Sequence, residues 1–291
     1  MPVASYAHDR MYTNDMAVYL RPRDLEEALV ALSRPHTVLA GGTDFYPARV
    51  GRTVDEDVLD IGGIASLRGI TADASGWRLG ATTTWSELIE ADLPALFDGL
   101  KQAAREVGGR QIQNAGTLAG NLCNASPAAD GVPCLLALDA EVELAGPSGH
   151  RRLPLSRFII GARETALAPG ELVVAIHVPR PPHEARSAFL KLGARRYLVI
   201  SIAMAAAVVE IDDGRVAAAR IAVGACSPVA RRLPALESAL AGAPLDSRLP
   251  DRVDVAHLAP LSPIDDVRGS AAYRSEVVLA LLRRVLASLA P

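Results

Sequence analysis

Two segments rich in small residues, far apart in the chain, constrain the fold more than any other feature. The first covers residues 38–46 (Val-Leu-Ala-Gly-Gly-Thr-Asp-Phe-Tyr), and the second covers residues 114–130. Small residues let a backbone approach an anion closely, and free N–H groups together with hydroxyls can hold a diphosphate. The two segments therefore predict a dinucleotide-binding site. Because the usual glycine fingerprint for nucleotides is missing, they favour a flavin nucleotide.

Length, composition and charge set broad bounds. The chain has 291 residues, of which 50% are hydrophobic, so it can bury a large core divided between two or three domains. The formal net charge is −3, and the arginine pairs are scattered along the chain. We therefore expect no basic surface for nucleic acid.

The cysteines and the hydropathy pattern argue against several kinds of site. Cys123, Cys134 and Cys226 form no Cys-x-x-Cys pair and have no histidine pair nearby, so neither a disulfide framework nor a structural zinc site is expected. Three thiols also fall short of the four ligands of an iron–sulfur cluster. The sequence has no apolar run of membrane-spanning length and no signal-like N-terminus, and it predicts a soluble, cytoplasmic protein.

Short strands mixed irregularly with helices predict an α+β fold rather than a doubly wound parallel sheet. Residues 1–15 are polar and patternless and predict a flexible N-terminal extension, and the prolines of residues 179–183 predict a linker. Asp213 and Gly214 predict the turn of a long hairpin. The expected strands cover 18–20, 37–40, 58–61, 68–71, 77–80, 141–144, 151–153, 172–178, 200–211 and 215–225, and the expected helices cover 25–32, 85–91, 93–107, 129–138, 233–240 and 271–289.

The first segment carries groups suited to an anion. The amides of Gly41 and Gly42 could form an anion-binding nest, and Thr43 adds a hydroxyl donor at the same place. The alternative is an ordinary turn after a short strand.

The second segment is more informative because hydroxyl, amide and small side chains are dense in it. Thr117, Asn121 and Ser126 supply donors, and Asp130 could accept a hydrogen bond from a ribose hydroxyl. The alternative is a buried turn whose Asn and Ser side chains cap backbone groups.

The chain shows no catalytic machinery of its own. It has no Gly-x-Ser-x-Gly elbow, no His-Glu-x-x-His motif and no EF-hand spacing. His177 is expected in the core or on the surface, and the adjacent carboxylates Asp265 and Asp266 are expected to be solvated charge. The chemistry should therefore belong to a bound cofactor, with no catalytic residue and no metal ligand in this chain.

At these segments the sequence resembles the FAD-binding medium subunit, or domain, of the molybdenum hydroxylases, which include xanthine dehydrogenase and carbon monoxide dehydrogenase. The similarity covers nearly the whole chain. It includes Phe45-Tyr46 in the first segment and the Gly-Asn-x-x-Asn-Ala-Ser-Pro-Ala-Ala-Asp core of the second, at residues 120–130. It extends to residues 170–179, 189–191 and 265–274. The second segment and the C-terminal motif are the specific parts.

The resemblance implies an α+β, two-subdomain FAD-binding fold of the vanillyl-alcohol-oxidase type. The FAD-binding domain would cover 16–180, with subdomains at about 16–65 and 66–180. A smaller α+β C-terminal domain would cover 184–291.

The resemblance also implies FAD as the cofactor and a set of residues that hold it. The first segment would wrap the diphosphate with its amides, and residues 117–121 would complete that site. Asp130 would face the adenosine side, Val107 and Val173 would pack on the flavin or adenine, and Lys191 would lie near the cofactor. The implied binding residues are Val38, Leu39, Ala40, Gly41, Gly42, Thr43, Asp44, Phe45, Tyr46, Val107, Thr117, Leu118, Ala119, Gly120, Asn121, Ser126, Asp130, Val173 and Lys191.

The partners follow from the same resemblance. A large molybdopterin subunit would hydroxylate the substrate with water as the oxygen source, and a small subunit with two [2Fe-2S] clusters would pass electrons singly to the FAD of this chain. The assembly would be a dimer of heterotrimers, and the electrons would leave in pairs to NAD, a quinone or oxygen. The acceptor stays open because Tyr197, Leu198 and Val199 stand where many relatives have acidic residues after an Arg-Arg pair.

Two other interpretations compete with this one. The first is a self-sufficient flavoenzyme of the same broad fold, such as a cell-wall enolpyruvyl reductase, which would need a substrate pocket with its own proton donor. The second is an assembly module without flavin, against which the intact small-residue segments argue.

Overall fold

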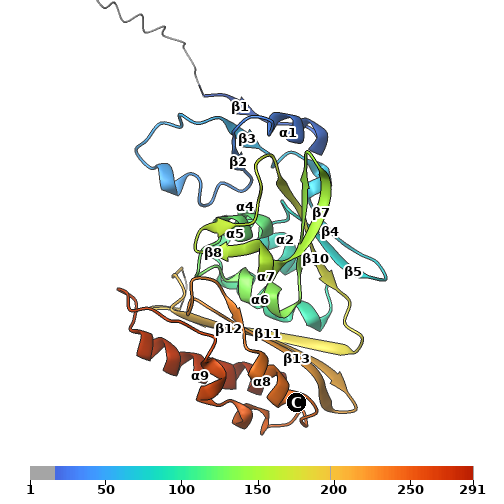
Figure 1. Ribbon diagram of the computed structural model, residues 1–291, viewed down its shortest axis with the longest axis vertical. Helices are drawn as coiled ribbons and strands as arrows, with labels where there is room; N and C mark the ends of the chain where they lie inside the picture. The colour runs from blue at the N-terminus through green and yellow to red at the C-terminus, as the bar shows by residue number, and fades with distance from the viewer. Residues whose placement is uncertain (1–16, 197, 291) are drawn as a thin grey trace, which may run out of the picture.

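The computed structural model describes residues 17–196 and 198–290, so the predicted extension at residues 1–15 and the position of Tyr197 lie outside the described residues. Three units are stacked in chain order, from the N-terminal unit at the top of Figure 1 to the C-terminal unit at the bottom. Three clusters of buried apolar side chains lie within and between them. Helices combine with mainly antiparallel sheets, which confirms the predicted α+β class.

The N-terminal unit is a small parallel sheet with one helix. The helix expected at residues 25–32 begins after Asp24, whose side chain accepts a hydrogen bond from the Glu27 N–H. Leu59 belongs to the same buried cluster as Leu172 and Val174 of the middle unit, which fixes the two units to each other. The elements are β1 (Tyr19–Leu20), α1 (Leu25–Ala31), β2 (Thr37–Leu39), the 3-10 helix η1 (Pro47–Arg49) and β3 (Val58–Asp60), in the strand order β1-β3-β2.

The middle unit is an antiparallel five-stranded sheet in the order β4-β5-β10-β6-β7, with helices packed on one face. Ile176 and Val178 on the central strand point into the apolar cluster that the helices share. Thr84 begins its first helix through a capping box with Glu87. The elements are η2 (Ala65–Leu67), β4 (Ile70–Ala72), β5 (Gly76–Gly80), α2 (Trp85–Glu90), η3 (Ala95–Phe97), α3 (Asp98–Glu106), α4 (Arg110–Ala115), α5 (Leu118–Asn124), α6 (Gly131–Ala137), β6 (Glu141–Gly146), β7 (Gly149–Pro154), α7 (Leu155–Phe158), β8 (Ile159–Gly161), β9 (Glu164–Thr165) and β10 (Leu172–Pro179).

Two predicted features of this unit are wrong. Residues 93–107 do not form one helix: Pro94 disfavours a helical residue before it, and the short turn η3 precedes α3. The second small-residue segment, for which no helix before residue 129 is among the expected ones, is helical at its centre, where α5 lies. Thr117 caps α5 by accepting a hydrogen bond from a backbone N–H, and Leu118 and Leu122, one helical turn apart, are fully buried. Capping and burial outweigh the low helix propensity of glycine and asparagine.

The C-terminal unit is a four-stranded antiparallel sheet between two helical layers, as Figure 1 shows. On β12, Met204 faces the cluster shared with the middle unit, while its neighbour Ala205 faces α8 and α9. Both faces are buried, which explains the unbroken apolar run of this strand. Asp213 and Gly214 form the predicted hairpin turn, with φ of 46° and 69°. The elements are β11 (Glu184–Leu192), β12 (Ala203–Asp212), β13 (Arg215–Gly224), β14 (Arg231–Arg232), α8 (Pro234–Leu240), η4 (Leu249–Arg252), η5 (Val255–Leu258) and α9 (Ala271–Leu289).

Strand β11 was not predicted, and one predicted property of the C-terminal motif is wrong. Asp266 is not merely solvated charge, because its Oδ1 accepts a hydrogen bond at 2.7 Å from Nη2 of Arg274, which is buried on α9. The backbone N–H of Arg268, together with Arg274, holds the pKa of this carboxyl at about 2. The motif therefore fixes the position of the start of α9.

Among the described residues, none of the helices is both long and apolar enough to cross a lipid bilayer.

Candidate cofactor-binding site

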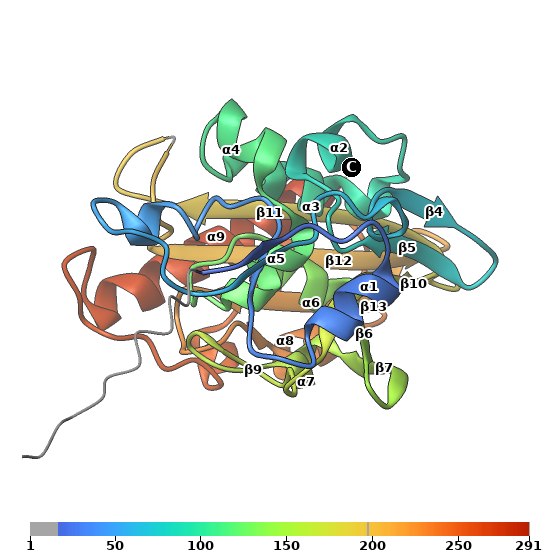
Figure 2. The same cartoon turned by 90° about the horizontal axis from the view of Figure 1, so that it is seen from above.

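The two small-residue segments lie side by side in the structure. A Cβ atom added at Gly41 would lie only 1.9 Å from the carbonyl oxygen of Ala115, so the two backbones are in direct contact. Further along, Nδ2 of Asn124 donates a hydrogen bond to Oδ1 of Asp44 at 2.9 Å. Figures 1 and 2 show the N-terminal unit lying over α5 in both views. The N-terminal and middle units therefore meet along these segments.

A cavity of about 610 Å³ opens where they meet. Tyr46, Leu118 and Lys191 do not line it: Tyr46 is exposed, Leu118 is in the core, and Lys191 lies behind Asp130. The predicted binding residues that do line it are Val38, Leu39, Ala40, Gly41, Gly42, Thr43, Asp44, Phe45, Val107, Thr117, Ala119, Gly120, Asn121, Ser126, Asp130 and Val173.

The first segment presents a row of free backbone donors to this cavity. Within the described part of the chain, the N–H groups of residues 40–45 have no protein acceptor, and the hydroxyl of Thr43 has no partner either. Tyr46 ends the row, because its N–H donates to the Gly42 carbonyl at 3.1 Å. Backbone donors without a partner are rare in folded proteins unless water or a ligand takes them. Because residues 40–45 line the cavity, the free N–H groups among them can hold an anion there.

The two glycines of this row serve different purposes. Gly42 has φ of 71°, in the left-handed region that a glycine adopts without strain. Gly41 is required for packing between the two segments, whereas its sequence context suggests only the close approach of a ligand. Its missing side chain makes room for the carbonyl of Ala115, and not only for a ligand. This glycine therefore brings the two segments together.

The second segment contributes side chains more than amides. The Gly120 N–H donates to Oγ1 of Thr117, and the Leu118 N–H donates to the Thr83 carbonyl, so these donors are already used. Oδ1 of Asn121 is buried against the cavity and has no partner within the described residues. A buried oxygen left without a donor is costly, which indicates that a bound group supplies one.

Asp130 lies at the boundary with the C-terminal unit in a buried ion pair. Its Oδ2 accepts from Nζ of Lys191 at 2.7 Å, and its Oδ1 accepts from Oγ of Ser201 at 2.6 Å. The side chains of Asp130 and Lys191 are only 9% and 5% exposed. Burial raises the pKa of the Asp130 carboxyl despite the nearby lysine. Nζ of Lys191 also donates to the Glu106 carbonyl at 3.1 Å, next to Val107 on the cavity wall.

Apolar side chains form another part of the wall. Val107 follows α3, and Val173, which is 3% exposed, stands near the start of β10. Ile61 and Trp85 also line the cavity. A free amide row, an unpartnered amide oxygen and an apolar wall together fit a diphosphate-linked molecule with a planar ring system, such as FAD.

Sequence reasoning missed several residues of this site. Arg163, from the turn between β8 and β9, lines the cavity, and so do Glu106 and Glu171. Arg163 stands outside the two small-residue segments, and charged side chains such as Glu106 and Glu171 do not belong to the pattern of small and hydroxylated residues that found those segments. The tertiary structure alone brings them to the cavity.

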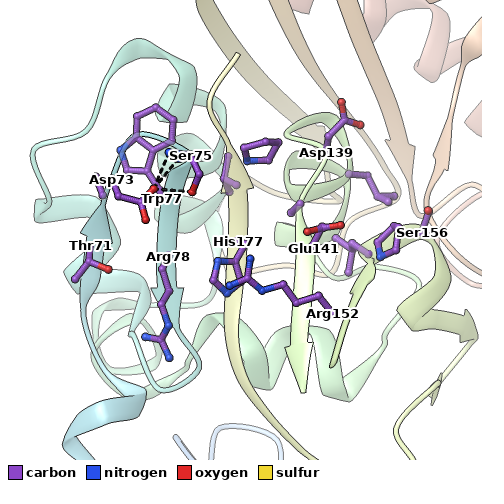
Figure 3. A pocket seen from close by; sticks show the side chains of 18 of the residues that line it. Thr71, Asp73, Ser75, Trp77, Arg78, Asp139, Glu141, Arg152, Ser156 and His177 are labelled. Atoms are coloured by element: carbon purple, nitrogen blue, oxygen red, sulfur yellow. Dashed lines mark hydrogen bonds between the residues drawn. The ribbon is translucent and has the colours of Figure 1, made fainter. Parts of the chain in front are cut away.

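A second cavity, of about 750 Å³, lies at the far end of β10. Figure 3 shows Asp73 and Trp77 on one side and Asp139 and Glu141 on the other, with His177 between them. Its cationic lining residues Arg78, Arg152 and Arg232 are balanced by the carboxylates Asp73, Asp139 and Glu141.

Glu143 on β6 organises the charges beside this second cavity. It accepts hydrogen bonds from Nε2 of His177 at 2.6 Å and from Nδ1 of His150 at 2.9 Å. Burial opposes ionisation of Glu143, but the two histidines outweigh it and hold the pKa of the carboxyl below its usual 4.5. His177 therefore lies in a partly buried polar network away from the first cavity.

Two family models match the sequence, and together they cover most of it. Residues 11–181 match the FAD binding domain in molybdopterin dehydrogenase, and residues 188–289 match the CO dehydrogenase flavoprotein C-terminal domain.

Curated relatives and solved structures agree with these matches. The chain is 32% identical over 283 residues to a putative xanthine dehydrogenase FAD-binding subunit of Escherichia coli (strain K12), covering 94% of this chain and 95% of that one. It is 30% identical to the carbon monoxide dehydrogenase medium chain of Afipia carboxidovorans, covering 92% and 94%. Its fold matches a chain of the reconstituted CO dehydrogenase from Oligotropha carboxidovorans with a TM-score of 0.85 and 30% identity, over 94% and 97% of the two chains.

Proposed function

Because the chain belongs to the family of FAD-binding medium subunits of the molybdenum hydroxylases, we propose that it is the electron-transfer subunit of a multi-subunit dehydrogenase. In that role it takes electrons from [2Fe-2S] clusters on a small partner subunit. It passes them to an external acceptor (NAD, a quinone or oxygen), while substrate is hydroxylated on a large molybdopterin subunit. The proposed assembly is a dimer of heterotrimers.

The observation that carries the proposal is that one cavity is lined both by residues 40–45, whose N–H groups have no acceptor among the described residues, and by Asn121, whose buried Oδ1 has no donor there. FAD, when bound, can exchange electrons either singly or in pairs. The residues of this chain bind and orient it. The amide row and the Thr43 hydroxyl hold the diphosphate, and Val107 and Val173 exclude water from the ring system.

The cysteines support electron supply from a partner. Within the described residues Cys134 and Cys226 are buried free thiols, Cys134 beneath α3 and Cys226 beside the C-terminal motif. Cys123 is alone on the wall of the cofactor cavity. Three separated thiols cannot ligate two clusters, so the donor clusters belong to another chain.

The relatives carry different substrate names, among them xanthine dehydrogenase, carbon monoxide dehydrogenase and nicotinate dehydrogenase. Medium subunits of similar sequence therefore accompany different substrates. We propose that the substrate of this complex is selected outside this chain, on the molybdopterin subunit.

The test compares the isolated chain with the reconstituted complex. We expect the isolated chain to be yellow, to release one FAD on denaturation, and to show no turnover of N-heterocycles, aldehydes or carbon monoxide. Reduced [2Fe-2S] partner should then bleach its flavin absorbance under anaerobic conditions. Substrate turnover by the isolated chain would support a self-sufficient flavoenzyme instead. A folded, colourless chain that binds no added FAD would refute the proposed function.

A further inference from the structure

The charges around the cofactor cavity are unevenly distributed. Asp44, Glu106, Asp130 and Glu171 all line it, and Arg163 is the one lysine or arginine among the described residues that does. Lys191 neutralises Asp130 and Arg151 neutralises Glu171, but neither cation reaches the lining. A guest with a doubly charged diphosphate therefore meets a wall where Asp44 and Glu106 have no cationic partner among the described residues and where Arg163 supplies the one positive charge.

The backbone at Arg163 is held in an unusual conformation. Its φ is 64°, in the left-handed region that residues other than glycine rarely adopt. Its N–H donates at 2.8 Å to the carbonyl of Ala125, which ends α5 with φ of 45°. Left-handed residues of this kind cost energy, and they persist where the surrounding structure fixes them, often at a binding site.

The side chain of Arg163 is oriented by one of its two terminal nitrogens. Nη1 donates to the carbonyl of Asn124 at 3.2 Å and also to Oδ1 of the same residue. Asn124 in turn donates to Asp44 of the first segment. This chain of contacts connects the β8–β9 turn, the end of α5 and the first segment. Nε and Nη2 of Arg163 have no partner within the described residues, which leaves N–H groups free at the cavity.

We propose that Arg163 is a cofactor-binding residue whose free guanidinium N–H groups bind the FAD diphosphate, with Asn124 and Asp44 as its positioning residues. The inference rests on the proposed function only in taking FAD as the guest. A guanidinium presents paired donors to phosphate oxygens, and hydrogen bonds between charged groups are the strong ones. The rival role is a structural one, in which Arg163 only caps the carbonyl end of α5.

The test uses the full-length chain stripped of flavin, with Arg163→Gln, Arg163→Lys and the matched control Arg157→Gln. Arg157 lies on α7, is exposed, and lines neither cavity. Dissociation constants are measured for FAD, for ADP as a diphosphate probe and for riboflavin as a probe without phosphate, at low and at high salt.

We expect Arg163→Gln to weaken the affinity for FAD and for ADP by about ten- to a hundredfold and to reduce the salt dependence of binding. Its affinity for riboflavin should stay within about twofold of the wild type. Arg163→Lys should retain part of the ADP affinity because it keeps the charge, and Arg157→Gln should match the wild type. If the affinities for riboflavin and for ADP fell equally, and the flavin-free chain melted at a lower temperature, Arg163 would only cap α5 and the proposal would be overturned. Unchanged FAD and ADP affinity in Arg163→Gln would overturn it too. If the wild type itself bound no FAD, the proposed function would fail first, so the two failures are distinguishable.

Discussion

The two large cavities lie at opposite ends of β10 and have similar volumes, about 610 and 750 Å³, yet they are built differently. Within the described residues, the first is lined by a segment whose backbone N–H groups have no partners and by a buried amide oxygen without a donor. The second is lined by cationic and carboxylate side chains in equal number. Volume therefore does not distinguish a cofactor site here. Polar groups without hydrogen-bond partners distinguish it instead. Burying such groups costs free energy, and a fold can retain them where a bound ligand supplies the missing partners.

The cavities also differ in how their charges are buried. Beside the first, the Asp130–Lys191 pair is almost completely removed from water, at 9% and 5% exposed. In the second, Arg152 is 53% exposed and lies 4.0 Å from Glu143. A buried charge depends strongly on its partner, whereas an exposed ion pair contributes little. Equivalent substitutions at the two places should therefore have unequal effects.

The largest effect is expected from Lys191→Met, which leaves the buried Asp130 carboxylate without its cation. We expect the free energy of unfolding at neutral pH to fall by about 3–5 kcal/mol, measured by urea denaturation. Asp130 already has a raised pKa, and losing the lysine raises it further. Because the pKa of Asp130 is higher in the folded state than in the unfolded state, ionisation of this carboxyl destabilises the fold at a pH above the raised pKa. The loss of stability in Lys191→Met should therefore shrink as the pH falls towards 3.8, the ordinary pKa of Asp.

Neutralising the carboxylate as well checks the cause of that loss. The double variant with Asp130→Asn should recover part of the stability. A loss below about 1 kcal/mol in the single variant would mean that the pair behaves like an exposed one, and the contrast between the cavities would disappear.

Gly41→Ala should have the next largest effect, and it addresses the contact between the two segments. The added Cβ would overlap the Ala115 carbonyl at 1.9 Å, so the segments must separate. Overpacking of this kind costs about 1–3 kcal/mol, which corresponds to a ten- to hundredfold weaker FAD affinity if the cost falls on the bound conformation. The readout is the ratio of flavin to protein absorbance after purification.

Gly63→Ala is the matched control in the same unit, because its Cβ would meet only the flexible Arg21 side chain, at 3.3 Å. Full flavin content in Gly41→Ala would show that the contact is dispensable for binding.

The smallest effect is expected at the second cavity, from Glu143→Gln. The folded-state pKa of Glu143 is lowered, so its ionised form stabilises the fold above its usual 4.5, and this contribution is lost as the pH falls through the lowered value. The variant should be less stable than the wild type by under about 1 kcal/mol at pH 7, and this difference should shrink as the pH falls below 4.5. Its flavin content should be unchanged. Loss of flavin in this variant would show that the two cavities are coupled through β10.

Local signals in the sequence predicted much of this protein correctly. The helices expected at 25–32 and 85–91 form behind the caps Asp24 and Thr84, and Asp213 and Gly214 turn the long hairpin, because each feature depends on hydrogen bonds or backbone angles within a few residues. The small-residue composition of the two segments indicated FAD for the same reason: small side chains and hydroxyls are a local property. The family motifs then gave the fold class and the cofactor, which the comparisons support.

Only the tertiary structure decided how those parts are used. Gly41 contacts Ala115, Lys191 neutralises Asp130, and Arg163 reaches the cavity through Asn124, and all three contacts join residues far apart in the chain. Periodicity and capping signals extend over one turn or one strand, so they contain no information on such pairs. The sequence alone determined the type of ligand, and the packing of three units determined which atoms meet it.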